Sequence, residues 1–94
     1  MGLRMLEKDI EARLVKECSK HGALCLKQNV VGRRGFPDRL IIAKNNRYIW
    51  VEVKTDTGKL SEGQQTAIEK LREQGCEVYV TYGLEQTLAV LEKL

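Results

Sequence analysis

Residues 35–54, GFPDRLIIAKNNRYIWVEVK, contain two apolar segments of strand length separated by Asn45-Asn46. Asn-Asn is typical of a turn, because asparagine tolerates a left-handed backbone and its amide bonds to nearby backbone groups. The first segment begins at Pro37-Asp38, and the second ends in Glu-Val-Lys. Ionised side chains seldom enter apolar strands unless they are paired, bind a metal or act in catalysis. The pattern therefore predicts a β-hairpin with charged groups gathered at one end.

Side chains alternate between the two faces of a strand, and this alternation predicts the register of the hairpin. In residues 47–54 the purely apolar set is expected in the core: Ile49, Val51 and Val53. Glu52 and Lys54 then lie on the opposite face, with Tyr48 and Trp50. Asp38 shares that face only if paired positions sum to 90, which places it opposite Glu52. Such a register requires an odd-numbered loop or a bulge between the strands, because a two-residue turn would give a sum of 91.

Two opposed carboxylates on neighbouring strands have Cβ atoms about 5 Å apart. They repel each other unless a cation or a proton lies between them. Lys54 follows two residues after Glu52 on the same face. Two carboxylates and an ammonium group around one point are typical of a site for a hard metal ion and an activated water. The alternative is a structural salt bridge at a sheet edge.

The rest of the chain predicts three helices and two further strands. Ile10, Leu14 and Cys18 recur at steps of four, with Leu6 and Val15 beside them, which indicates a helix over residues 5–21 that stops at Gly22. The other predicted elements are strands at 23–30, 37–44, 47–54 and 76–82, a helix at 61–74 capped by Ser61 and stopped by Gly75, and a helix at 84–94.

The element order is therefore α-β-β-β-α-β-α. A helix between the third and fourth strands permits a parallel crossover, while the second and third strands form an antiparallel hairpin. We expect an α/β fold with a mixed sheet flanked by helices on both faces. Ninety-four residues suit a single domain over 1–94, because the chain is too short for two.

Composition limits the compartment and the partners. Three cysteines without a CxxC pair favour free thiols in a reducing cytosol. No apolar run is long enough for a membrane span, and the charged N-terminal residues lack the apolar core of a signal peptide. A net charge of +3 permits contact with nucleic acid without requiring it. Arg33, Arg34 and Arg39, in and beside the loop before Asp38, are interpreted as phosphate contacts; solubilising charge is the alternative.

Four short motifs occur in a characteristic order: Glu7-Lys8-Asp9-Ile10, Gly35-Phe36-Pro37-Asp38, Glu52-Val53-Lys54 and Ser61-Glu62-Gly63-Gln64. Together they resemble the virus-type replication-repair nuclease (VRR-NUC) domain. That family belongs to the PD-(D/E)xK nuclease superfamily and has a restriction-endonuclease-like core. The resemblance covers nearly the whole chain.

The resemblance implies a role for each matching residue. Asp38 and Glu52 are similar to the family's metal-binding carboxylates, which hold Mg²⁺ or Mn²⁺ together with the backbone carbonyl of Val53. Lys54 matches the catalytic lysine, which orients or deprotonates the attacking water and offsets charge at the phosphate. Gln64 matches the glutamine that orients groups around the site.

Two residues of the first helix are candidates for its acid. Glu7 matches the family's leading glutamate. Glu11 lies one turn further and shares its face, so either residue can serve. Glu7 is the preferred assignment.

The resemblance implies a metal-dependent DNA endonuclease in replication, recombination or repair, often in phages, with branched DNA such as Holliday junctions as the expected substrate. We expect it in the cytoplasm of a bacterial cell or a phage-infected host. A non-catalytic DNA-binding module that retains the fold is the main alternative, and a small protein-interaction domain is another.

One chain holds one Asp-Glu-Lys set, whereas resolving a junction requires cuts on two strands, so a homodimer is expected. The C-terminal segment has four leucines at helical spacing, which form either intramolecular core or an interface: Leu84, Leu88, Leu91 and Leu94.

Overall fold

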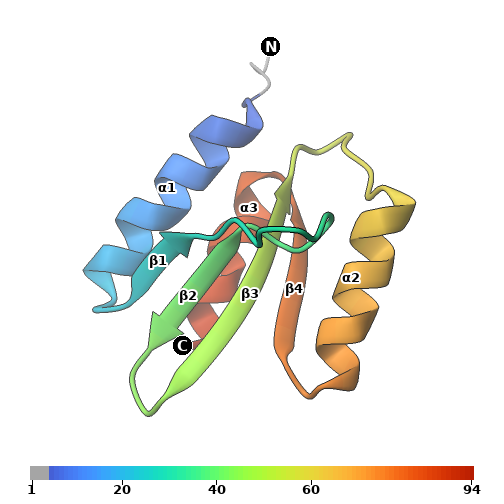
Figure 1. The fold of residues 1–94 in the computed structure, drawn as a ribbon. Coiled ribbons are helices and arrows are strands. Elements are labelled where there is room, and N and C mark those ends of the chain that lie inside the picture. Colours follow the sequence, from blue (N-terminus) through green and yellow to red (C-terminus); the bar gives the residue numbers. More distant parts are fainter. Residues whose placement is uncertain (1–4) are drawn as a thin grey trace.

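A computed structural model describes residues 5–94, and the part of the N-terminal prediction that concerns residues 1–4 lies outside them. The chain forms, in order, α1 (Glu7–Lys20), β1 (Leu24–Lys27), β2 (Arg39–Ala43), β3 (Arg47–Lys54), α2 (Glu62–Glu73), β4 (Glu77–Tyr82), α3 (Gly83–Ala89) and a short 3-10 helix, η1 (Val90–Lys93). The predicted order of helices and strands is confirmed, as Figure 1 shows.

The four strands form one mixed sheet in the order β1-β2-β3-β4. The first three strands are antiparallel neighbours, and β4 runs parallel to β3 after the crossover through α2. In the hairpin Leu40 pairs with Trp50 and Ile42 with Tyr48, so the predicted sum of 90 is confirmed, but the ladder ends before the expected pair of Asp38 and Glu52. A three-residue loop, 44–46, joins the strands. Asn45 and Asn46 both have left-handed backbones, at φ 63° and 62°, which asparagine adopts more readily than most residues.

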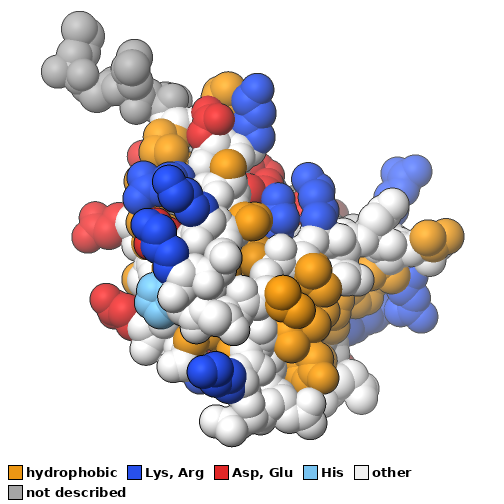
Figure 2. Space-filling model, turned by 90° about the vertical axis from the view of Figure 1, so that its left-hand side faces the viewer, with side chains coloured by type: hydrophobic (Ala, Val, Ile, Leu, Met, Phe, Trp, Pro, Cys, Tyr) orange, Lys and Arg blue, Asp and Glu red, His pale blue; other side chains and the backbone are white. Residues whose placement is uncertain are grey.

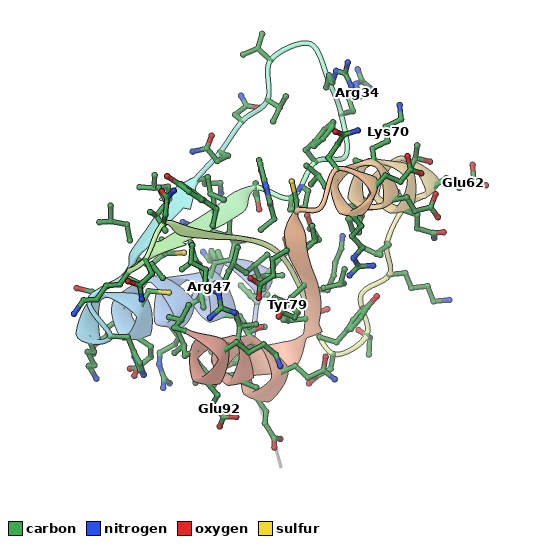
Figure 3. All side chains as sticks on the ribbon, turned by 90° about the horizontal axis from the view of Figure 1, so that it is seen from below. Arg34, Arg47, Glu62, Lys70, Tyr79 and Glu92 are labelled. Carbon is green, nitrogen blue, oxygen red and sulfur yellow. The ribbon has the colours of Figure 1, made fainter. Side chains whose placement is uncertain are left out.

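Helices cover the two faces of the sheet unequally. α1, α3 and η1 pack on one face, whereas α2 lies on the other face alongside β4 (Figures 1 and 3). The main core lies under α1 and α3, and the predicted apolar set of β3 faces it: Ile49, Val51 and Val53, none more than 1% exposed. The segment between β1 and β2 crosses in front of the sheet, reaches α2 and turns back to β2 (Figure 1).

Some predicted boundaries were wrong. The first two strands are shorter than expected, because the chain on either side of the 28–38 connection leaves the ladder early. Pro37 and Asp38 therefore precede β2 instead of opening it, and Pro37 is fully buried. The last predicted helix is divided into α3 and η1.

The inner face of α1 differs from the predicted stripe in one respect. Ile10, Leu14 and Cys18 are buried as expected, but Leu6 and Val15 are exposed. Glu11 completes the buried face and is only 5% exposed. A buried carboxylate in this position requires a partner.

The C-terminal leucines belong to the intramolecular core. Leu91 is buried in the core cluster, and the other three pack against it: Leu84, Leu88 and Leu94. The interface alternative for this stripe therefore loses its support.

The sheet face opposite α1 leaves hydrophobic side chains of β1 and β3 open to solvent. Leu24, Leu26 and Tyr48 are 59%, 38% and 50% exposed. Figure 2 shows hydrophobic side chains gathered on this side of the molecule. Within residues 5–94, no helix is both long enough and apolar enough to cross a membrane.

Candidate active site

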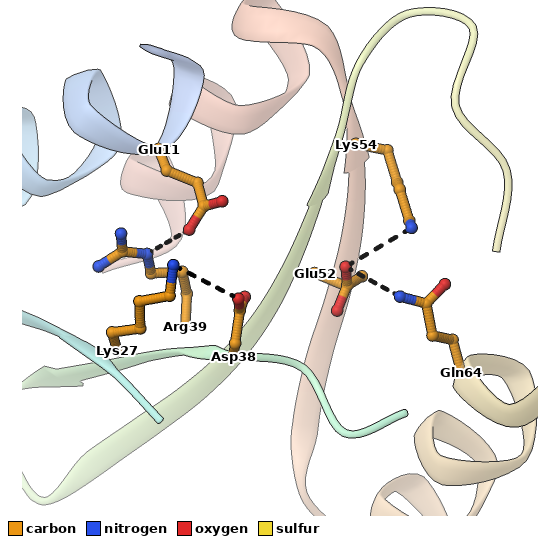
Figure 4. A network of polar contacts seen from close by, with 7 residues as sticks. All are labelled: Glu11, Lys27, Asp38, Arg39, Glu52, Lys54 and Gln64. Atoms are coloured by element: carbon orange, nitrogen blue, oxygen red, sulfur yellow. Dashed lines mark hydrogen bonds and ion pairs between the residues drawn. The ribbon is translucent and has the colours of Figure 1, made fainter. Parts of the chain in front are cut away.

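Glu52 is the centre of a polar group on the α2 side of the sheet. It lies near the end of β3, on the face opposite the core valines, and it is 5% exposed. Its Oε2 lies 3.9 Å from Lys54 Nζ and accepts a hydrogen bond from Gln64 Nε2 at 3.4 Å (Figure 4). Strand alternation puts Lys54 beside Glu52, and the N-terminus of α2 supplies Gln64.

The surroundings of Glu52 disfavour its charged form. Burial is the largest cause and the negative charge of Asp38 the second, and together they raise the pKa of Glu52 to about 7. The Lys54 ammonium lowers this pKa, but the more distant carboxylates of Glu7 and Glu11 raise it further. The site therefore places an acid of raised pKa where several negative charges converge, a condition that a bound cation would relieve.

Asp38 approaches this site from the segment that leads into β2. The hairpin ladder ends at the Arg39–Val51 pair, one step before Asp38. The backbone carbonyl of Asp38 instead accepts a hydrogen bond from the N–H of Gln28, so the chain here follows the β1 side. Figure 4 shows Asp38 and Glu52 on adjacent segments. The Asp38 carboxylate is also 3.9 Å from Lys27 Nζ, in an exposed ion pair.

Gln64 has two bonding partners through the two atoms of its amide. Ser61 is the N-cap of α2, and its Oγ accepts from the backbone N–H of Gln64 while Gln64 Oε1 accepts from the Ser61 N–H at 2.9 Å. This capping box fixes the amide and leaves its Nε2 to donate to Glu52. The cap of the helix and the orientation of the buried carboxylate therefore depend on the same side chain.

The two candidate acids of α1, Glu7 and Glu11, differ in their environments. Glu11 Oε1 accepts a 2.6 Å hydrogen bond from Arg39 Nε, and both side chains are nearly buried, at 7% and 14% exposed. Glu7 is exposed and, within residues 5–94, forms no ion pair. Glu7 thus lacks the partner that Glu11 has, and its assignment as the acid of the site stays a prediction.

Arg39 lies apart from the other two arginines of its predicted group. Its position opposite Val51 places its side chain on the α1 face of the sheet, where Glu11 holds it. Arg33 and Arg34 are exposed in the loop that reaches α2. The predicted register already implies that Arg39 faces the core, because paired positions that sum to 90 place it opposite the core residue Val51. The register does not predict the partner, because Glu11 lies 28 positions earlier, on α1.

Asp38 and Glu52 provide the oxygen donors that a hard divalent cation prefers, with the Val53 backbone carbonyl beside them. In the part of the chain that the structure describes, no cluster of three or more His, Cys, Asp or Glu side chains is close enough to hold a metal ion by itself. The negative charge of Asp38 nevertheless repels that of Glu52 and, after burial, is the second cause that raises the pKa of Glu52. The residues fit a cation that is held by two carboxylates, a carbonyl and solvent.

Comparisons with known proteins agree with these motifs. The VRR-NUC domain matches residues 3–85. A protein named "Putative nuclease p44", from Acyrthosiphon pisum secondary endosymbiont phage 1, is 37% identical over 79 residues, which cover 83% of this chain and 85% of the phage protein.

Solved structures show the same fold. A VRR_NUC domain superposes with a TM-score of 0.85 at 28% identity, over 92% of this chain and 94% of its own. Hjc, a Holliday junction resolvase from Archaeoglobus fulgidus, superposes with a TM-score of 0.58 at 24% identity, over 81% of this chain and 67% of its own. The latter likeness shows the restriction-endonuclease-like fold alone. With the family match over most of its length, the chain belongs to the VRR-NUC domain family of nucleases.

Proposed function

We propose that the protein is a Mg²⁺- or Mn²⁺-dependent DNA endonuclease. The observation that supports this most directly is Glu52, a nearly buried carboxylate that the charge of Asp38 makes harder to ionise and that Lys54 and Gln64 contact. A purely structural ion pair has no need of a second carboxylate that opposes it. The phage relative is named as a nuclease, which is consistent with the proposal.

Each residue of the site has a role in this proposal. Asp38, Glu52 and the Val53 carbonyl would hold the cation, which supplies Lewis-acid polarisation of the phosphodiester and a bound water of lowered pKa. Lys54 holds a positive charge beside Glu52 and would stabilise the negative charge that builds on the phosphate during in-line attack. Gln64 keeps Glu52 oriented, and Glu7 extends the acidic set from α1.

Nicking of supercoiled plasmid tests the proposal. Wild-type protein should nick in Mg²⁺ or Mn²⁺ and not in EDTA, and Lys54→Ala should lose most of this activity while it still binds DNA. Lys44→Ala, an exposed lysine in the hairpin loop, is the matched control. If Lys54→Ala cut at the wild-type rate, the catalytic role would be wrong. Binding without any metal-dependent cleavage would favour a non-catalytic DNA-binding module.

Two finer features belong to the same proposal. Branched DNA such as a Holliday junction, the substrate that the family resemblance of the sequence implies, is the proposed substrate. A homodimer is the proposed assembly, because each chain has one Asp-Glu-Lys set and a junction requires two cuts. The exposed leucines of β1 offer an apolar surface for a second copy.

A further inference from the structure

A groove runs between the loop before β2 and the outer side of α2. Its first part is a hollow of about 330 Å³, lined by Arg33, Arg34, Phe36, Gly63, Thr66 and Lys70 among others. A second hollow of about 280 Å³ shares Arg33, Phe36 and Lys70 with the first and extends to Gln74. We call the two together the α2 groove. Because they share three lining residues, they form one continuous channel on the surface.

The α2 groove is positively charged where it lies nearest the active site. Arg33, Arg34 and Lys70 all line its first hollow, and no acidic side chain does. Within residues 5–94 none of these three cations forms an ion pair. Glu73 lines only the second hollow. Figure 3 shows Arg34 and Lys70 near each other at the loop and α2.

The backbone around the groove is held in place by a close contact. Gly35 has a left-handed backbone, φ 86°, and a Cβ atom there would collide with the carbonyl of Gly63 in the first turn of α2. The missing side chain of Gly35 thus allows the loop to touch the backbone of the helix. This contact places the loop that carries Arg33 and Arg34 beside the helix that carries Lys70.

On α2 the groove lining and the active site are one residue apart. Gly63 lines the groove, and the next residue, Gln64, donates to Glu52. A nucleic-acid strand that leaves the scissile phosphate across the first turn of α2 would enter the groove directly. Phe36 adds an aromatic side chain to its lining, which suits a sugar or base next to phosphates held by cations.

We infer that the α2 groove binds the phosphodiester backbone of the DNA segment that flanks the scissile bond on one side, with Lys70 as a contact in addition to Arg33 and Arg34. The inference rests on the proposed function, since it names the track along which the substrate of that site lies. Lys70 on α2 would contact this strand, which would run from the active site along α2.

Binding to fluorescently labelled DNA in EDTA, which prevents cleavage, tests the contact. Lys70→Glu should weaken binding roughly tenfold, about 1.4 kcal/mol, and should lower the slope of log K against log salt by about 1. Lys16→Glu makes the same charge change on exposed α1, away from the groove, and should leave both quantities near wild type. Equal effects of the two substitutions would overturn the inference.

A series of substrates shortened on either side of the cleavage point tests the direction. With wild-type protein, shortening on one side should lower kcat/KM, and in Lys70→Glu that same shortening should have little further effect, because the contact is already lost. Independent effects of shortening and substitution would contradict the inference. If wild type cleaves DNA but Lys70→Glu and Lys16→Glu bind it equally well, the groove does not bind the substrate, and the proposed nuclease function is unaffected. If wild type neither cleaves nor binds DNA, the proposed function itself is wrong.

Discussion

At the scale of the residue, Glu52 shows how one side chain can connect stability to function. It is buried on the face of β3 that also presents Lys54, and its raised pKa reflects burial first and the charge of Asp38 second. In its charged form, this carboxylate therefore destabilises the metal-free fold.

The raised pKa of Glu52 predicts a pH dependence of stability without metal. Because the folded pKa of about 7 lies above the ordinary value of 4.5, the folded state binds the proton more tightly. Stability should therefore fall as pH rises from about 4.5 through 7, by up to about 3 kcal/mol. Urea unfolding in EDTA between pH 5 and 8 measures this.

Glu52→Gln should remove most of that slope and should be more stable than wild type at pH 8. Glu69→Gln, an exposed acid on α2, is the control and should keep the slope. Mn²⁺ should stabilise wild type more at pH 8 than at pH 5.5, because protons compete for the same carboxylate. A slope that Glu52→Gln leaves unchanged would assign the titration to another group.

The two bonds of Gln64 can be separated by substitution. Glu at this position keeps an oxygen for the Ser61 N–H and so preserves the capping box, but it cannot donate to Glu52. Gln64→Ala should lose roughly 0.5–1 kcal/mol of stability at pH 5.5, whereas Gln64→Glu should stay near wild type there. Both should cleave more slowly, Gln64→Glu the more so because it adds negative charge beside Glu52. Normal cleavage by Gln64→Glu would show that the bond to Glu52 has no role in the reaction.

At the scale of the element, the loop before β2 and the start of α2 act as one unit. The loop carries Arg33 and Arg34 and ends at Asp38, while α2 provides Gln64. Their backbones meet at Gly35 and Gly63. A displacement of either element would therefore move Asp38 relative to the groove and to Gln64.

Gly35→Ala should reduce stability and cleavage more than an alanine substitution at a glycine that has only the same backbone strain. Gly32 is the matched control, because it also has a left-handed backbone, φ 81°, but has open space where a Cβ would lie. Both substitutions should cost about 1–2 kcal/mol through their backbones. Only Gly35→Ala should add a collision with Gly63, further destabilisation and a loss of cleavage. Plasmid nicking and urea unfolding measure the two effects, and equal behaviour of both variants would refute the role of the contact.

At the scale of the whole molecule, the helices leave part of one sheet face uncovered. α2 covers the β4 side of that face, whereas Leu24 and Leu26 at the β1 edge remain exposed. Because the C-terminal leucines pack in the intramolecular core, this edge is the surface that we expect to contact a second copy.

Sedimentation at micromolar concentration should show a dimer. Leu24→Lys with Leu26→Lys should give a monomer that nicks one strand but no longer cuts both strands of a junction in one encounter. Val31→Lys, at a 90% exposed side chain in the loop, should leave the dimer intact. A monomeric wild type that cuts both junction strands in one encounter would overturn this prediction.

The hairpin register, the ends of α2 and the family follow from the sequence alone, because each depends on residues that are close together in the chain. Strand alternation and the requirement that Ile49, Val51 and Val53 share the core specify the hairpin register, which in turn requires the three-residue loop. Ser61 and Gly75 mark the ends of α2 because capping depends on neighbouring residues. The motifs at Asp38 and Glu52 identify the family without coordinates.

Tertiary structure decided the features that join residues distant in sequence. Glu11 and Arg39 are 28 positions apart, and only the packing of α1 against β2 shows that they bury each other's charge. Gln64 meets Glu52 because the crossover brings α2 beside the sheet, and the loop meets α2 because Gly35 has no side chain to keep the two backbones apart. No local pattern predicts such contacts, because each depends on how whole elements pack. The sequence alone thus determined the strands, their register and the family, whereas packing decided which charges are paired, which remain for a ligand and where a groove opens beside them.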